Sequence, residues 1–252
     1  MQNCYSPLPV QPQLPVSIDN DASMKRLDTS RQSYDEMRRS FMQLGAVTSA
    51  VGSAYVEVGC TRVVCAVYGP RTDTRARREF SKEGQLVCDV KYAPFADKLA
   101  RRERGQDPDE TELSTILQEA LAPAVMLHKL PKCILSVFVT ILEDDGGVFT
   151  AAINSASLAL ADAAVEMYDM VTAASAAIIN ESVIFDPNRE EEQRGDGKLT
   201  LAYMPSMGRV TYMLQAGKVH HTQLQEAVDL CTDACTGVTR SMLTASLVQA
   251  LS

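Results

Sequence analysis

The sequence predicts an α+β protein made of two sheet-plus-helix halves. Segments rich in Val, Thr and Tyr alternate unevenly with segments of helical periodicity, and near the middle a strand, a Gly-Gly turn and an Ala-rich helix follow one another. With 252 residues, 46% hydrophobic and 22% charged, the chain can bury one large core or two smaller ones. We expect a Pro-rich disordered extension at residues 1–40, a first half at 41–167 and a second half at 168–252 that ends in a long helix.

The first half is predicted to begin as a β-meander. Its β-branched segments are separated by glycines or polar loops, and we assign them as the strands Thr48–Val51, Gly52–Val58, Thr61–Tyr68 and Leu86–Tyr92. A helix is expected at Glu112–His128, where apolar residues recur at helical spacing. Asp109 or Thr111 is expected to cap this helix. Pro123 is expected to bend it, because proline removes one backbone hydrogen bond.

The most informative motif joins an apolar strand to an Ala-rich helix through two glycines. The strand is expected at Cys133–Leu142, three carboxylates end it, and the helix follows Gly146 and Gly147. Such a turn presents backbone N–H groups at the positive end of a helix, where phosphate can bind. The glycines lack a Cβ atom, so they would let that ligand approach the backbone closely. Val148 and Phe149 come next and offer neither a donor nor a charge, so the backbone suits phosphate and the side chains do not.

The second half is predicted to contain more strands and one long helix. Charged or Gly/Pro turns separate its strands, which we place at Val171–Ile179, Ser182–Phe185, Leu199–Tyr203 and Val210–Leu214. Thr222 and Gln225 form a capping box that is expected to start the terminal helix. The acidic run Glu190–Glu192 is interpreted as a solvated turn.

Composition narrows the class of protein. A formal net charge of −8 argues against a protein that coats nucleic acid with its whole surface, although it does not describe a local patch. The 7 cysteines lack CxxC spacing and mostly lie in apolar patterns, so we expect core residues of a protein in a reducing compartment. Cys231 and Cys235 would share a helix face, but no second ligand pair accompanies them, and no metal site is expected. We expect neither a secretory segment nor a membrane span.

Several motifs together resemble the RNase PH family. They are GSAYVEVGCTRVVCAVYGPR at Gly52–Arg71, the EDDGG-to-ALADA segment at Glu143–Ala163, DPNREEE at Asp186–Glu192 and LTLAYMP at Leu199–Pro205. The resemblance extends from Arg31 to Ser252 and implies the RNase PH-like fold, which is also described as ribosomal protein S5 domain 2-like. Active members of the family use inorganic phosphate to attack the 3′-terminal phosphodiester of RNA and release a nucleoside diphosphate.

The resemblance also implies that the catalytic positions are degenerate. Active members carry Thr-Arg after the Gly-Gly turn, where the arginine binds phosphate through two parallel hydrogen bonds, and this chain has Val148 and Phe149. A second phosphate- or RNA-binding arginine corresponds to Asp109, and the catalytic Asp corresponds to Lys198. Asp196 would restore one carboxylate in a shifted alignment. Without the arginine the nucleophile is not bound, so we expect no independent phosphorolysis.

Within the family, the chain is similar to the non-catalytic ring subunits of the eukaryotic RNA exosome. This similarity implies a hetero-hexameric ring of RNase PH-like subunits, S1/KH-type cap subunits and single-stranded RNA as partners, with no cofactor and no membrane. It also implies a role in rRNA processing and mRNA turnover, in the nucleus, the nucleolus and the cytoplasm. Two alternatives stay open: a working phosphate-dependent 3′ exoribonuclease, and an RNA-binding homo-oligomer outside any exosome.

One basic segment is the best candidate for RNA contact. Residues 71–104 contain ten Lys or Arg against six Asp or Glu, in a chain of net charge −8. This asymmetry is expected of a surface that follows an RNA backbone, and a solvated loop without a specific role is the alternative. We assign RNA contact to five arginines, which are Arg77, Arg78, Arg101, Arg102 and Arg104.

Overall fold

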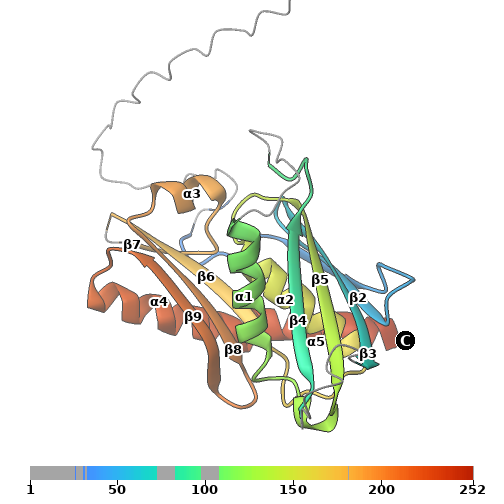
Figure 1. Ribbon diagram of the computed structural model, residues 1–252. Coiled ribbons are helices and arrows are strands. Elements are labelled where there is room, and N and C mark those ends of the chain that lie inside the picture. The colour runs from blue at the N-terminus through green and yellow to red at the C-terminus, as the bar shows by residue number, and fades with distance from the viewer. Residues whose placement is uncertain are drawn as a thin grey trace, which may run out of the picture.

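Two β-sheets, one in each half of the chain, form the body of the protein (Figure 1). The computed structural model describes residues 26, 31, 33–72, 83–97, 108–180 and 182–251. Helices pack on both sheets, so the α+β class predicted from the sequence is confirmed.

The first half contains a five-stranded sheet with the order β1-β2-β3-β5-β4. Its strands are β1 (Ser40–Leu44), β2 (Gly52–Val58), β3 (Thr61–Thr72), β4 (Gln85–Tyr92) and β5 (Cys133–Glu143). Neighbouring strands are antiparallel except β4 and β5, which are parallel and are joined through a helix, as a parallel pair requires. Val56, Val63 and Val137 point to the same face of this sheet and have no exposed surface, so that face forms the first core.

Two helices cover the buried face of this sheet. α1 (Pro108–Leu121) buries the apolar stripe that contains Leu113, Leu117 and Leu121. α2 (Val148–Asp162) contacts β2 and β3 of the first sheet and also β6 and β8 of the second, which is why it is buried on nearly all sides. Gly52 of β2 allows the end of α2 to pack closely on the sheet, because a Cβ atom placed on it would lie 2.2 Å from the backbone nitrogen of Ala163.

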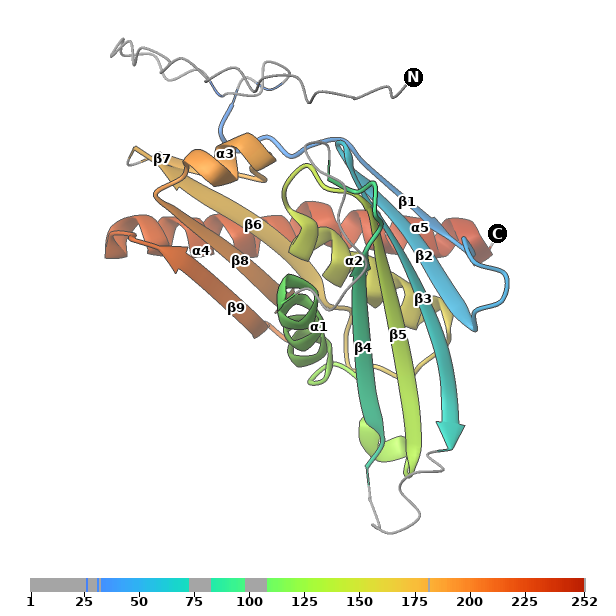
Figure 2. The same cartoon turned by 45° about the horizontal axis from the view of Figure 1, so that its top comes forward.

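The second half contains a four-stranded antiparallel sheet with the order β7-β6-β8-β9. Its strands are β6 (Thr172–Ile179), β7 (Ser182–Phe185), β8 (Gly197–Met204) and β9 (Arg209–Gly217). The chain ends in one long helix that runs behind both sheets (Figures 1 and 2), consisting of α4 (His221–Ala234), a π-helical turn (Cys235–Thr239) and α5 (Arg240–Leu251). α4 packs on the second sheet, whereas α5 reaches β1 and α2 of the first half. In the described ranges, none of the helices has the length and apolarity that a membrane crossing requires.

Some predicted elements were wrong in position. Thr48–Val51 forms a turn, and the first strand is instead β1, whose pattern is half exposed and therefore inconspicuous in the sequence. α1 already includes Asp109 and Thr111 in its first turns, and it ends at Leu121 instead of bending at Pro123. A helix commonly ends just before a proline, because proline disfavours the helical conformation of the preceding residue. His220, paired with Gln223, caps α4 two residues before the predicted cap.

The acidic run predicted to be a solvated turn forms a short helix, α3 (Arg189–Arg194). The side chain of Glu191 has no exposed surface, and its carboxylate lies 3.3 Å from Arg26 Nε and 3.7 Å from Arg31 Nη2. It also accepts a hydrogen bond of 3.0 Å from the backbone N–H of Asn188. A carboxylate can be buried in this way because its cations are buried with it. The two cations, Arg26 and Arg31, lie near the N-terminus of the sequence.

Three arginines bind the N-terminal segment to this part of the fold. Arg26, Arg31 and Arg38 lie within residues 1–40, the range predicted to be a disordered extension, yet all three are buried. Arg38 donates to both carboxylate oxygens of Asp186, at 2.6 and 3.0 Å, and to the carbonyl groups of Asp145 and Gly146, at 3.0 and 3.3 Å. The predicted extension therefore does not hold at these three residues. Arg38 connects the loop before α2, in the first half, to the loop after β7, in the second.

Replacing Arg38 by Met should destabilise the protein strongly. The variant leaves the buried Asp186 carboxylate with the backbone N–H of residue 38, at 2.8 Å, and with Arg31, which is more distant at 3.8 Å. It also removes one donor each from the carbonyl groups of Asp145 and Gly146. Removing one partner of a buried ion pair costs about 3–5 kcal/mol, and we expect the free energy of unfolding in urea to fall by that order. Arg62→Met is the matched control, because Arg62 pairs with Glu57 on the exposed surface. Equal losses in the two variants would contradict the prediction.

The cysteines should differ sharply in reactivity. Burial raises the pKa of Cys88 and of Cys235 to about 12, and it also raises the pKa values of Cys65 and Cys231, whereas Cys60 is exposed. The thiolate is the nucleophile, so iodoacetamide in mildly alkaline buffer should alkylate Cys60 much faster than these four, as read by peptide mass spectrometry. Rapid alkylation of Cys88 in the folded protein would mean that the first core is not closed.

Candidate functional site at the Gly-Gly turn

The turn between β5 and α2 has the backbone geometry of an anion site. Gly146 and Gly147 have φ values of 86° and 66°, in the left-handed region that favours glycine. Gly147 is the N-cap of α2 and has no side chain with which to satisfy the helix end. Its N–H instead donates a hydrogen bond of 2.8 Å to Oε1 of Glu192. A carboxylate of the chain itself therefore binds at the positive end of α2.

The space beside both glycines is filled by protein. A Cβ atom on Gly146 would lie 2.5 Å from the backbone nitrogen of Arg189, where α3 begins, and one on Gly147 would lie 2.6 Å from Nη2 of Arg38. In the ribbon, α3 lies near the loop that leads from β5 into α2 (Figures 1 and 2). The sequence interpretation, in which the glycines let a ligand approach, is therefore corrected: here they let α3 and Arg38 approach.

Several charges act on the Glu192 carboxylate. Burial raises its pKa above the ordinary value, and the negative charge of Asp144 acts in the same direction. The Gly147 N–H and the positive charges of Lys198 and Arg38 oppose this shift by stabilising the ionised form. Lys198, the residue predicted to occupy the catalytic Asp position, is thus one of the cations that favour the internal carboxylate.

The remaining degenerate positions supply no cation to the turn. Val148 is 7% exposed and Phe149 is half-buried, and both pack on the first core. Asp109 lies exposed in the first turn of α1 and is acidic. Sequence reasoning missed Arg189, which does lie at the turn, but its guanidinium already binds both carboxylate oxygens of Asp97, at 3.0 and 2.9 Å. The only signal for Arg189 in the sequence was its position inside the DPNREEE motif.

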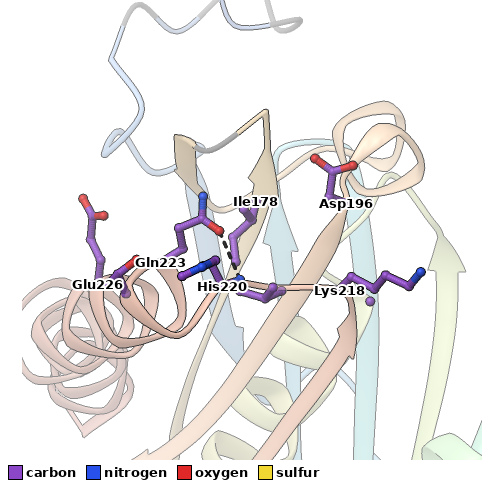
Figure 3. Close-up of a pocket in the computed structure, with 9 residues that line it drawn as sticks. Ile178, Asp196, Lys218, His220, Gln223 and Glu226 are labelled. Carbon is purple, nitrogen blue, oxygen red and sulfur yellow. Dashed lines mark hydrogen bonds between the residues drawn. The ribbon is translucent and has the colours of Figure 1, made fainter.

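Asp196 lies in a separate cavity of about 1000 Å³ beside the start of α4 (Figure 3). In Figure 3 it stands on the same side as Lys218, with His220 and Gln223 in the middle and Glu226 on the other side. Its Oδ2 accepts a hydrogen bond of 3.2 Å from the backbone N–H of Asn180. No described residue of the Gly-Gly turn lines this cavity, and a catalytic role of Asp196 in a shifted alignment stays a prediction.

The five arginines predicted to contact RNA lie outside the described residues, in the ranges 73–82 and 98–107. Two other cations of the same basic segment are described. The Arg71 guanidinium lies 5.6 Å from the centre of the Tyr68 ring, and Lys91 Nζ lies 3.5 Å from Oδ2 of Asp89. RNA contact by the five arginines stays a prediction.

Comparison with known proteins identifies the two halves separately. Residues 36–166 match the 3′ exoribonuclease family, domain 1, and residues 169–234 match domain 2 of the same family. The chain is 38% identical over 231 residues to an exosome complex component RRP41-like protein of Arabidopsis thaliana, covering 91% of this chain and 88% of the relative. It is 36% identical over 239 residues to exosome complex component MTR3 of Mus musculus, covering 89% and 85%.

A solved structure shows the same fold. The crystal structure of rice (Oryza sativa) Rrp46 has a TM-score of 0.76 against this chain at 20% identity, covering 86% of this chain and 99% of the rice chain. The predicted RNase PH-like fold is thereby confirmed. Because both family domains match in order and the relatives are similar over most of their length, this chain belongs to the RNase PH family of 3′ exoribonucleases.

Proposed function

We propose that this chain is a non-catalytic subunit of an RNA exosome ring. The names of its relatives, which are exosome complex components, support the assembly. The single observation that supports loss of catalysis is the composition of the Gly-Gly turn: Val148 and Phe149 stand after the glycines, and the Gly147 N–H is already bound to Glu192. Phosphorolysis needs cationic donors that hold inorganic phosphate beside the RNA terminus. The described residues at this turn offer an internal carboxylate instead.

An uncovered sheet face supports the role as a ring subunit. α1 and α2 cover one face of the five-stranded sheet, and apolar side chains are exposed on the other: Phe41 is 55% exposed, Val87 44% and Phe138 43%. Tyr68 extends this surface, with its ring centre 5.8 Å from that of Phe138. Exposed apolar groups of this kind are typical of surfaces that bind other proteins.

The charges on the same face also favour a protein partner over RNA. Arg62 pairs with Glu57 at 3.3 Å and with Glu143 at 3.4 Å, and Lys91 pairs with Asp89 at 3.5 Å. These cations are compensated within the chain, whereas binding of an RNA backbone requires cations that can replace its counterions. We therefore assign this face to contact with another RNase PH-like ring subunit.

The proposal includes partners and a cellular setting. The ring is a hetero-hexamer closed by S1/KH-type cap subunits, and single-stranded RNA passes it in contact with the basic ranges that hold Arg77, Arg78, Arg101, Arg102 and Arg104. The assembly serves rRNA processing and mRNA turnover, in the nucleus, the nucleolus and the cytoplasm. The similarity of the chain to exosome components supports this part of the proposal.

We expect this chain to contribute no phosphorolytic activity to a reconstituted ring. The chain is combined with RNase PH-like partner subunits, and nucleoside diphosphate release from poly(A) is measured with inorganic phosphate. We expect the chain alone to release none, and the rate of the ring to be unchanged when this chain carries Asp196→Asn, a change that keeps an acceptor for the Asn180 N–H. Release by the chain alone, or a ring rate that collapses with Asp196→Asn, would establish the alternative function of a phosphate-dependent exoribonuclease.

Phe138→Asp should weaken assembly of the ring. The substitution places a charge on the uncovered sheet face, where docking would bury it without a partner. Complex formation with each partner subunit is followed by size-exclusion chromatography with light scattering. The comparison variant is Val248→Asp, which makes an apolar-to-acidic change at an exposed position of α5. Loss of assembly with Phe138→Asp and not with Val248→Asp is expected, and normal assembly of the Phe138 variant would exclude this face as the interface.

A further inference from the structure

We propose that a surface formed by His128, Tyr168, Arg209 and Arg240 binds single-stranded RNA, with a base stacked on the Tyr168 ring and phosphates on the two arginines. We call it the Tyr168 surface. It lies where the turn between β8 and β9 meets the loops that follow α1 and α2, at the end of the second sheet away from α3 (Figures 1 and 2). The proposal rests on the proposed function, in which the ring handles RNA. It adds a contact site that contains none of the five arginines of the basic segment and no residue of the Gly-Gly turn.

The loop that carries Tyr168 is fixed by the loop after α1. The Tyr168 N–H donates to the Ala124 carbonyl at 2.8 Å, and the Met126 N–H donates to the Glu166 carbonyl at 3.0 Å. His128 follows in the same loop after α1, and its ring stacks on that of Tyr168, with ring centres 6.4 Å apart and an angle of 30° between the planes. Contacts within the chain therefore hold the Tyr168 ring in one orientation, although the residue is 51% exposed.

The turn between β8 and β9 brings two arginines to this loop. The Asp169 carboxylate, next to Tyr168, accepts a hydrogen bond of 2.6 Å from the Ser206 N–H. Arg240, at the start of α5, donates to the Ser206 hydroxyl at 3.0 Å. Arg209 begins β9 on the far side of the same turn. An aromatic ring and two guanidinium groups from distant parts of the sequence thus share one region of the surface.

The charges of the two arginines are available to a ligand. Arg209 and Arg240 are exposed, and within the described part of the chain neither forms an ion pair. The neighbouring acids are engaged elsewhere: Glu166 pairs with Lys129, and the Asp169 carboxylate accepts two backbone N–H groups. RNA binding requires cations that can replace the counterions of the phosphates. The Tyr168 surface offers such cations, whereas the cations of the uncovered sheet face are paired within the chain.

The ring and the charges together favour RNA over a protein partner. Every base has a π-face that can stack on an exposed aromatic ring, and a guanidinium beside the ring can bind the phosphate that follows. A protein that covered the same surface would remove two unpaired charges from water and would have to supply an acid for each. In a chain of net charge −8, an exposed ring beside unpaired arginines is the combination that single-stranded RNA requires.

The test measures the affinity of the full chain for a fluorescein-labelled uridine oligonucleotide by fluorescence anisotropy, over a series of salt concentrations. Tyr168→Ala removes the ring, and Tyr168→Phe keeps the ring without its hydroxyl. Arg209→Gln and Arg240→Gln each remove one charge. The matched controls are Phe41→Ala, at another exposed aromatic residue, and Arg62→Gln, at an exposed arginine that is paired with a carboxylate.

We expect Tyr168→Ala to weaken RNA binding about tenfold, which lies within the range for stacking of one base on an aromatic ring. Tyr168→Phe should bind as the wild type does, because it keeps the π-face. Each arginine variant should lower the slope of log K against log salt concentration by about 0.7, the value for one phosphate contact to a single strand. The two controls should leave affinity and slope unchanged. If Tyr168→Ala does not fold, Tyr168→Leu decides in the same way, because it keeps apolar volume without an aromatic face.

Three results would overturn the proposal. One is wild-type RNA affinity in a folded Tyr168→Ala or Tyr168→Leu chain, and another is an unchanged salt dependence in both arginine variants. The third is a loss of binding to a ring or cap subunit in these variants with RNA affinity unchanged, which would make the surface a protein interface. None of these results decides the proposed function, because ring assembly and nucleoside diphosphate release are measured separately from RNA affinity.

Discussion

The buried bidentate pair between Arg38 and Asp186 is the contact on which the rest of the site depends. Both side chains are removed from water, and such charges are tolerated only when each is fully paired. The remaining donors of Arg38 bind the carbonyl groups of Asp145 and Gly146, so one guanidinium holds two loops from different halves of the chain in one place. The contacts of Arg38 consequently fix the position of the Gly-Gly turn and the start of α2 relative to the loop that leads to α3.

This arrangement explains why glycines stand at both positions of the turn without any need for a ligand. Gly147 is packed against Arg38, and Gly146 is packed against the backbone at the start of α3, so a side chain at either position would collide with the contacts that join the halves. Glycine is therefore required here by internal packing, independently of any ligand. A Gly-Gly turn before a helix identifies this scaffold, and the side chains that face it decide what the scaffold binds.

The sequence predicted most of what depends on local periodicity. β2 and β7 were predicted with their observed ends, because β-branched runs bounded by turns are a local signal.

The errors fall where structure is set by distant partners. The acidic residues of α3 were predicted to be solvated, because the arginines that allow Glu191 to be buried stand about 160 positions earlier in the sequence. Arg26 and Arg38 were assigned to a disordered extension for the same reason, since their acidic partners are equally distant. The absence of donors at Val148 and Phe149 was readable in the sequence. The binding of Glu192 to Gly147 was not, because hydrogen bonding across 45 positions leaves no local pattern.

A helix N-terminus whose buried N–H groups lack partners destabilises the folded protein. The N-terminus of α2 still directs its dipole and the Gly147 N–H at one point, and a buried donor without a partner costs about 1–3 kcal/mol. The Glu192 carboxylate of α3 supplies a partner for this N–H from within the chain, so the hydrogen bond does not depend on the concentration of an anion in solution. The Gly147 N–H is thus satisfied inside the fold, and Lys198 adds a cation where the resemblance implies a catalytic carboxylate.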